Sequence, residues 1–147
     1  MAAAAILSAT IGHLTLWTTR HRSGHTLVEA CDFITDIGHR TALGTRAELG
    51  FTGGGPQWLV TELGVFDFPD GQARLVQVFP DVSLADVRAV TGFPVESAGD
   101  LRAIRPPSVA ELAAVRSVDP LGVRRSEFSP RELARVFEPA AGQDCAC

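Results

Sequence analysis

Lysine is absent from this sequence, and all 13 basic residues are arginine against 17 acidic residues. The formal net charge of −4 carries no basic footprint of the kind that binds nucleic acid. We interpret the exclusive use of arginine, together with abundant Ala, Val and Gly, as the mark of a GC-rich coding genome. Nucleic acid is therefore not an expected partner.

Cysteine is also scarce, with Cys31, Cys145 and Cys147 as its three examples. An odd number with two members in the last three residues predicts no disulfide framework. Cys145 and Cys147 could form a metal pair or a lipidation signal, but metal sites usually have four ligands and nothing nearby supplies the others. We favour a reduced, flexible tail at residues 139–147 and expect no metal site.

Long hydrophobic runs are missing as well. The apolar start, Met1–Leu7, has no positive flank and is soon interrupted by Ser8 and Thr10, so we expect neither a signal peptide nor an anchor. The remaining balance, 46% hydrophobic and 20% charged, is that of one soluble globular domain. The composition thus predicts a cytoplasmic protein without a membrane partner, and its apolar start suits a buried strand or helix that has lost what normally precedes it.

Common catalytic motifs are not found. A serine nucleophile would need the G-x-S-x-G elbow, and a nucleotide-binding loop would have to open a helix, whereas Gly53-Gly54-Gly55-Pro56 leads into a strand. Among the four histidines only His21 and His25 have helical spacing, and Gly24 between them disfavours a helix. We interpret the histidines as facing solvent or as satisfied in the core.

Period-two hydrophobic patterns predict a sheet in the first half of the chain. A near-continuous apolar run of the QWLVT kind is typical of strands buried on both faces. Pro69-Asp70-Gly71 supplies turn chemistry between two alternating segments, which indicates a hairpin. The predicted strands are residues 13–19, 26–35, 57–61, 64–68 and 74–79, with a loop over residues 36–55.

The hydrophobic period then changes to that of helices, and three helix starts share one signal. A serine is followed three residues later by an acid, the spacing of a capping box, at Ser83 with Asp86, Ser108 with Glu111 and Ser129 with Glu132. Strands followed by helices, in a chain whose strands have the pattern of full burial, predict an α/β arrangement completed by elements from elsewhere.

Two features qualify as candidate binding elements. A glycine triplet, Gly53, Gly54 and Gly55, lets a backbone approach a ligand closely or simply forms a tight turn. Glu62 follows the predicted strand 57–61, and ligands of α/β sheets bind outside the carboxyl ends of strands. We name these four residues as the substrate-binding candidates, with a turn and a cap as their structural alternatives.

The segment from Gly53 to Gly92 is similar to the conserved tail of CoA-transferase β subunits of the glutaconate and 3-oxoacid type. GGGP, WLVTELGVFDF, RLVQVFPDVSLADV and TGF occur in the family's order. LVEACDFITDIGH upstream and RPPSVAELAAVRSVDPLGV downstream extend the resemblance to about residues 11–123. TIGH and LVEACD further resemble an actinobacterial branch of steroid-ring degradation.

The resemblance implies an α/β fold, namely half of a NagB/RpiA/CoA-transferase-like Rossmann-type sheet with a β-hairpin and C-terminal helices. It implies one β-like domain over residues 1–138, truncated at its N-terminus relative to the family. The function implied first is CoA transfer between carboxylic acids, in fatty-acid or steroid catabolism, as a heteromer with an α subunit. An acyl-CoA thioester would be the substrate, with no permanently bound cofactor.

The family's catalytic glutamate and a glycine-rich oxyanion loop have no match here, so the resemblance assigns no catalytic residue. One alternative is a subunit of a hydrolase that opens a ring in a cyclic CoA thioester during steroid catabolism. Another is a non-catalytic half-subunit, a structural module that completes another sheet. A free-standing small-molecule binding domain would rest on the glycine triplet alone.

Overall fold

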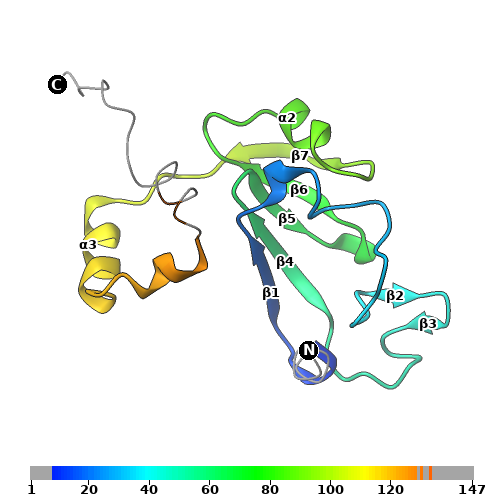
Figure 1. Ribbon diagram of the computed structural model, residues 1–147. Helices are drawn as coiled ribbons and strands as arrows, with labels where there is room; N and C mark the ends of the chain where they lie inside the picture. Colours follow the sequence, from blue (N-terminus) through cyan, green and yellow to red (C-terminus); the bar gives the residue numbers. More distant parts are fainter. Residues whose placement is uncertain (1–7, 129, 131–132, 134–147) are drawn as a thin grey trace. The chain divides into compact units, whose positions relative to one another are not determined.

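A computed structural model describes residues 8–128, 130 and 133 of the chain. It consists of two compact units, residues 1–105 and 106–147, of which the first contains every described strand (Figure 1). No helix among the described residues is long and apolar enough to cross a membrane. The predicted domain limits at 138 and 139 stay a prediction, because that boundary lies outside the described residues.

The first unit is built on a five-stranded mixed sheet in the order β1-β4-β5-β6-β7. Strand β1 pairs in parallel with β4, β4 to β6 run antiparallel, and β6 pairs in parallel with β7. A separate two-stranded hairpin is formed by β2 and β3. The strands are β1 (Leu14–Thr18), β2 (Arg40–Thr41), β3 (Gly44–Thr45), β4 (Pro56–Thr61), β5 (Gly64–Asp67), β6 (Arg74–Val78) and β7 (Glu96–Ala103).

Two predicted capping boxes are confirmed. Helix α2 (Leu84–Ala89) begins after Ser83, whose hydroxyl accepts from the Asp86 amide while the Asp86 carboxylate accepts from the Ser83 amide. Helix α3 (Val109–Val118), in the second unit, has the same reciprocal cap. Each cap satisfies backbone donors that a helix start leaves free. The third predicted helix, after Ser129, lies largely outside the described residues.

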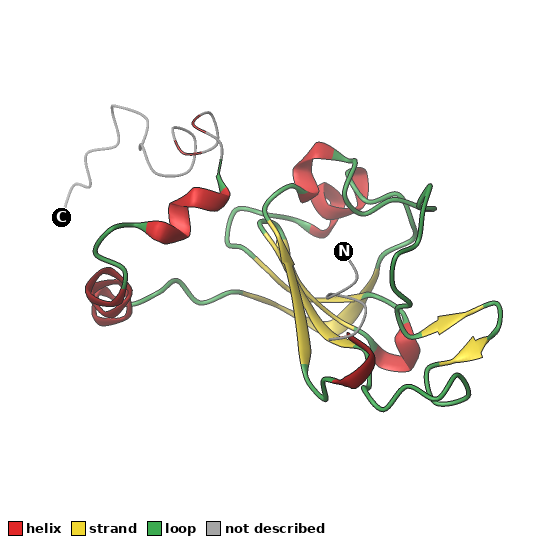
Figure 2. Ribbon diagram, turned by 60° about the horizontal axis from the view of Figure 1, so that its bottom comes forward, coloured by secondary structure: helices red, strands yellow, loops and turns green. Residues whose placement is uncertain are grey.

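One face of the sheet holds the core of the first unit. Phe66 on β5 and Leu75 on β6 lie opposite each other and are fully buried. Helix α2 packs on this face through Val87. Figure 2 shows the sheet with the short helices of the chain around it. The seven buried hydrophobic residues of the core are Leu27, Leu63, Phe66, Leu75, Val82, Val87 and Val95.

The prediction of a strand at residues 26–35 is wrong. This segment consists of bends without strand pairing, and Phe33 and Ile34 are 78% and 69% exposed. It is held instead near its start, where the Thr26 hydroxyl donates to the Arg20 carbonyl at 2.8 Å and the carbonyl of the buried Leu27 accepts from the Gly92 amide at 2.7 Å. Its apolar residues are of types common in strands, but the segment pairs with no strand in the described part of the chain.

The predicted loop over residues 36–55 contains the short hairpin of β2 and β3, which no sequence pattern predicted. Strand β7 was missed for a different reason. Its sequence, ESAGDLRA, contains charges and a glycine and has no apolar alternation. Backbone hydrogen bonds from its parallel pairing with β6 hold β7 in the sheet, and its side-chain pattern gives no sign of this pairing.

Candidate functional site

The carboxyl ends of β1 and β4 lie side by side, because Thr18 is paired with Thr61 in the parallel ladder. The chain continues from β1 into a 3₁₀ turn, η1 (His21–Ser23), and from β4 into Glu62. This is the edge where α/β sheets place their ligands. We therefore take His21, Thr61 and Glu62 as the centre of the candidate site.

Glu62 is half-buried, and both of its carboxylate oxygens are occupied. Oε2 accepts from the amide of His21 at 3.0 Å, and Oε1 accepts from the amide of Arg22 at 2.8 Å. The side chain thus satisfies two free donors at the start of η1 and ties this turn to the end of β4. Glu62 lies where the sequence placed it, and its contact with substrate stays a prediction.

His21 is fully buried between β4 and the end of α2. The sequence had left two alternatives for it, a place in the core or on the surface, and the structure places it in the core. Nε2 lies 2.9 Å from the Thr91 hydroxyl, and Nδ1 lies 3.2 Å from the Thr61 hydroxyl. Thr91 donates its own proton to the Val87 carbonyl at 2.7 Å, so Nε2 must donate to Thr91. A neutral ring with its proton on Nε2 satisfies this arrangement.

Burial lowers the pKa of His21, and the nearby carboxylate of Glu62 opposes that shift. A ring protonated on Nε2 alone offers Nδ1 as an acceptor to the Thr61 hydroxyl at 3.2 Å, and the single proton of that hydroxyl is shared between Nδ1 and the Gly64 carbonyl at 3.1 Å. Thr61 already accepts from the amides of Leu63 and Gly64 at 3.1 Å each. His21 therefore connects η1 to Thr61 of β4 and to Thr91 after α2.

The glycine triplet lies at the other end of β4. Six residues separate the two ends, which at about 3.3 Å per residue is about 20 Å. A Cβ on Gly53 would lie 2.7 Å from the Ile11 carbonyl oxygen. Gly55 has a φ of +84°, and a Cβ there would lie 3.1 Å from the side chains of both His39 and Arg46. Gly53 and Gly55 are thus required for packing and turning, while Gly54 is exposed with open space around its Cα.

Arg46 organises this loop, and no sequence signal pointed to it. Its side chain is 5% exposed and donates to the carbonyls of Gly53 at 2.8 Å, Ile37 at 3.0 Å and Gly38 at 2.9 Å, and to the Ser8 carbonyl. These acceptors come from three segments distant in sequence. A buried guanidinium can join them because its donors diverge in one plane.

His39 lies beside the triplet, with its ring 5.1 Å from that of Phe68. Burial lowers its pKa, against a backbone hydrogen bond with Pro56 that raises it. Its Nε2 is buried and has no hydrogen-bond partner in the described part of the chain. The structure thus places a histidine with a lowered pKa at each end of β4.

The four histidines do not converge. His13 bonds to the Gln57 side chain at 2.9 Å, while His25 is exposed. Within residues 8–128, no group of three or more His, Cys, Asp or Glu side chains has a metal-binding arrangement. Cys31 is an exposed free thiol, and Cys145 and Cys147 lie outside the described residues.

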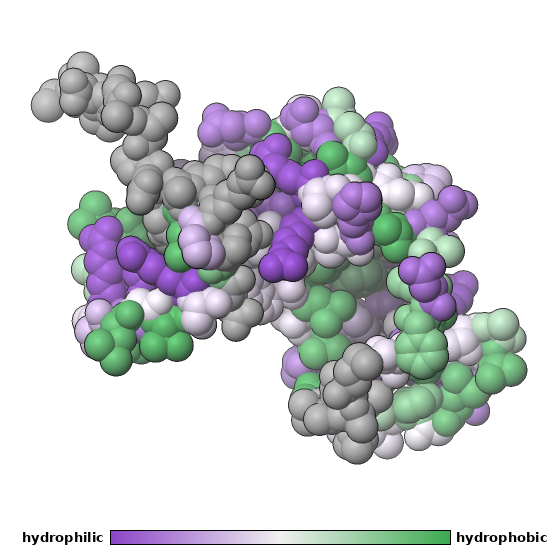
Figure 3. Space-filling model, viewed as in Figure 1, coloured by the Kyte–Doolittle hydropathy of each residue, from purple (hydrophilic) through white to green (hydrophobic). Residues whose placement is uncertain are grey.

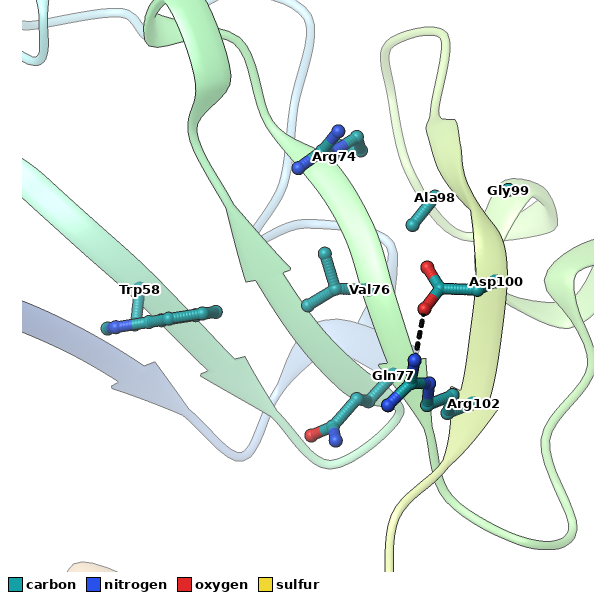
Figure 4. A pocket seen from close by; sticks show the side chains of 8 residues that line it. All are labelled: Trp58, Arg74, Val76, Gln77, Ala98, Gly99, Asp100 and Arg102. Atoms are coloured by element: carbon teal, nitrogen blue, oxygen red, sulfur yellow. Dashed lines mark hydrogen bonds and ion pairs between the residues drawn. The ribbon is translucent and has the colours of Figure 1, made fainter.

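A shallow hollow of about 380 Å³ lies on the sheet face opposite the core (Figure 4). It forms where β6 and β7 lose register, since Leu75 pairs with Ser97 but Gln77 pairs with Arg102. Bulges of this kind redirect side chains. The lining residues are Trp58, Arg74, Val76, Gln77, Ala98, Gly99, Asp100 and Arg102.

Known proteins resemble this arrangement over most of the chain. It is 33% identical over 122 residues to the cholesterol ring-cleaving hydrolase IpdB subunits of Mycobacterium tuberculosis and Mycobacterium bovis. The alignment covers 81% of this chain and 48% of those subunits, so the chain spans about half the length of these curated relatives. No family model matches the chain.

Solved structures agree with this likeness. Glutaconate coenzyme A-transferase from Acidaminococcus fermentans superposes with a TM-score of 0.62 at 22% identity, over 78% of this chain and 44% of that one. The chain has a CoA-transferase family I-like fold. IpdAB of Rhodococcus jostii RHA1 superposes with a TM-score of 0.62 at 26% identity, over 80% of this chain and 47% of that one. The decarboxylase AibA/AibB superposes with a TM-score of 0.53 at 26% identity, over 78% of this chain and 40% of that one.

The CoA-transferase family I-like fold confirms the expected fold class and the resemblance stated from the sequence. The chain is similar to subunits of a hydrolase and a decarboxylase in sequence and in fold, and to a transferase in fold alone. Two of these structures, IpdAB and AibA/AibB, are named as complexes of two subunits.

Protonation of His21 should destabilise this CoA-transferase-like unit. In the unfolded chain a histidine takes up a proton near pH 6.5, whereas the folded site resists it. The free energy of unfolding should therefore be highest above pH 6.5 and fall as the pH decreases below it. Urea denaturation across this range should show the slope. H21Q should reduce it without removing it, because His39 is shifted the same way.

The matched control is H25Q, because His25 is exposed and lies in the same loop. It should leave the pH dependence as in the original chain. An H21Q protein with an undiminished slope would mean that His21 is not the group that resists protonation.

Proposed function

We propose that this chain is part of a subunit of a ring-cleaving hydrolase that acts on cyclic CoA thioesters in steroid catabolism. The observation that carries the proposal is the 33% identity to the cholesterol ring-cleaving hydrolase IpdB subunit, supported by the 26% identity and TM-score of 0.62 with IpdAB. The reaction would add water across a carbon–carbon bond of the ring. One carbon becomes a carboxylate and the other takes up a proton.

CoA transfer, the function expected first from the sequence, has weaker support. The glutaconate coenzyme A-transferase shares 22% identity with this chain, a likeness of fold alone. The proposed enzyme takes the CoA thioester as substrate and needs a second subunit, by analogy with IpdAB and AibA/AibB.

We also propose that the carboxyl end of β1 and β4 contributes to substrate binding, through the turn that Glu62 holds. Two backbone amides bound by one carboxylate fix η1 in place, and a fixed turn can present its remaining groups to a ligand. At the other end of β4, Gly54 is the member of the triplet open to a ligand. A substrate that contacts both ends must extend over about 20 Å.

The test is to purify the chain together with the second subunit of Rhodococcus jostii IpdAB and to supply a steroid-derived cyclic CoA thioester. Mass spectrometry should detect a ring-opened CoA thioester heavier by one water. An added carboxylate that acquires CoA would instead indicate CoA transfer. If the complex forms and neither product appears, the proposed hydrolase is wrong.

Substitutions then separate the two binding ends. G54L places a side chain in open space and should raise KM several-fold, while G99L, at an equally open glycine on β7, should not. E62Q replaces one of the two acceptor oxygens with an NH2 group, which leaves one amide of η1 without an acceptor, and should also raise KM. Unchanged KM values in both variants would remove these residues from the binding site.

A further inference from the structure

The segment that follows β1, residues 20–27, is closed on itself, and we call it the strap. The Arg20 carbonyl accepts from the Ser23 amide at 3.2 Å, from the Ser23 hydroxyl at 2.6 Å and from the Thr26 hydroxyl at 2.8 Å. Compact surface loops of this kind are held together by their own side chains. Because these bonds lie within the strap, they persist if the strap moves as a unit.

Two polar attachments join the start of the strap to the rest of the unit. Glu62, at the end of β4, accepts from the amides of His21 and Arg22. The His21 ring lies between the hydroxyls of Thr61 and Thr91, at 3.2 and 2.9 Å. The start of the strap is therefore held by hydrogen bonds around one buried histidine.

A third attachment lies at the far end of the strap, where Leu27 enters the core and its carbonyl accepts from the Gly92 amide at 2.7 Å. His21 and Leu27 are the buried residues of the strap, and its other side chains are exposed. Figure 3 shows mainly polar residues where Figure 1 draws the strap beside α2, whereas apolar surface gathers over β2 and β3. A segment with so little apolar burial opens at a low free-energy cost.

A second proton on His21 does not fit the closed strap. Nε2 already donates to Thr91, whose own proton goes to the Val87 carbonyl. Nδ1 faces the Thr61 hydroxyl, whose oxygen already accepts from two backbone amides of the turn after β4. A hydroxyl oxygen has two lone pairs, so a proton on Nδ1 would have no acceptor. The doubly protonated ring must therefore leave this position.

The surrounding charges do not remove this conflict. The charged side chains on the elements packed against His21 are Glu62 at the end of β4, Arg22 on η1, and Asp86 and Arg88 on α2. Glu62 raises the pKa of His21, but burial lowers it more strongly and Arg22 adds to the lowering. Asp86 is engaged in the cap of α2, and Arg88 donates to a backbone carbonyl. From β5 the ring meets only the aromatic side chain of Phe66, at 5.8 Å.

We propose that the strap opens as a unit while the sheet stays folded, and that His21 takes up a proton when it opens. The turn bound by Glu62 moves away with the strap, so the candidate site is complete only in the closed state. Opening is linked to proton uptake, and acid therefore favours it. Below the ordinary pKa of histidine, about 6.5, each pH unit raises the opening equilibrium constant by up to about tenfold. The inference does not depend on the proposed function.

Amide hydrogen exchange of the full chain, followed by NMR from about pH 5 to about pH 8, tests this opening. The amides of His21, Arg22 and Gly92 report on the strap, and those of the central strand β5 report on the sheet. The three strap amides should share one protection factor, lower than that of β5 at every pH. Below about pH 6.5 this factor should fall by up to about tenfold per pH unit.

Three variants identify the group responsible. H21Q should remove the pH dependence of the strap amides, while H25Q, at an exposed histidine of the strap, should leave it unchanged. E62Q should raise strap opening several-fold at every pH and leave β5 unaffected. The comparison of strap with sheet needs only the original chain. Strap amides as protected as β5, or a pH dependence that survives in H21Q, would overturn the proposal.

Discussion

Replacing Arg46 with methionine is expected to lower the free energy of unfolding by about 3 kcal/mol. Methionine fills a similar volume but cannot donate, so the carbonyls of Gly53, Ile37 and Gly38 lose their buried partner. Each unsatisfied buried carbonyl costs about 1–3 kcal/mol, and local hydration recovers part of the sum. Urea denaturation of R46M and the original chain gives the difference.

The loss should be local as well as global. Amide hydrogen exchange should accelerate first at Gly53, whose own amide donates to the Ala9 carbonyl at 2.9 Å. R116M, at an exposed arginine of α3, is the matched control and should change stability by less than about 0.5 kcal/mol. An R46M chain as stable as this control would show that the carbonyls find other partners.

Replacing Phe66 with alanine should cost about 3–5 kcal/mol, the range for a large aromatic side chain deleted from a packed core. Phe66 is fully buried on β5 and lies between Leu59 and Leu75 in the ladders. Its ring is 5.8 Å from that of His21. The deletion therefore leaves a cavity that reaches the candidate site, and denaturation should show both the loss and a broadened transition.

F66A also changes His21. Because burial is the main reason why the pKa of His21 is low, a cavity that admits water should move it back toward its ordinary value. NMR titration of the ring protons can follow this shift. F33A, at a side chain that is 78% exposed, should alter neither stability nor the titration. A stable F66A protein would mean that the core is not centred on β5.

Local patterns were reliable where one short segment contains its own partner. The capping boxes at Ser83 and Ser108 formed because the hydroxyl and the acid lie within one turn of each other. The hairpin of β5 and β6 formed for the same reason. Its turn places Asp70 at φ of 55°, a conformation that aspartate tolerates better than most residues.

Site residues were harder to predict, because their roles depend on contacts between distant segments. Glu62 was named from its place at a strand end, but its partners, His21 and Arg22, are some 40 positions earlier in the chain. His21 and Arg46 carry no motif. Their importance comes from burial, which a histidine or an arginine in a loop does not reveal in one sequence.

By itself, the sequence determined the charge balance, two helix starts, the central hairpin and the resemblance to CoA-transferase β subunits, since each depends on neighbouring residues or on ordered motifs. Only the tertiary structure decided that Glu62 binds the amides of His21 and Arg22 and that Trp17 and Trp58 lie on the same face of the sheet. The reason is physical. Strand pairing and register bring together residues more than 40 positions apart, and register is set by the whole sheet.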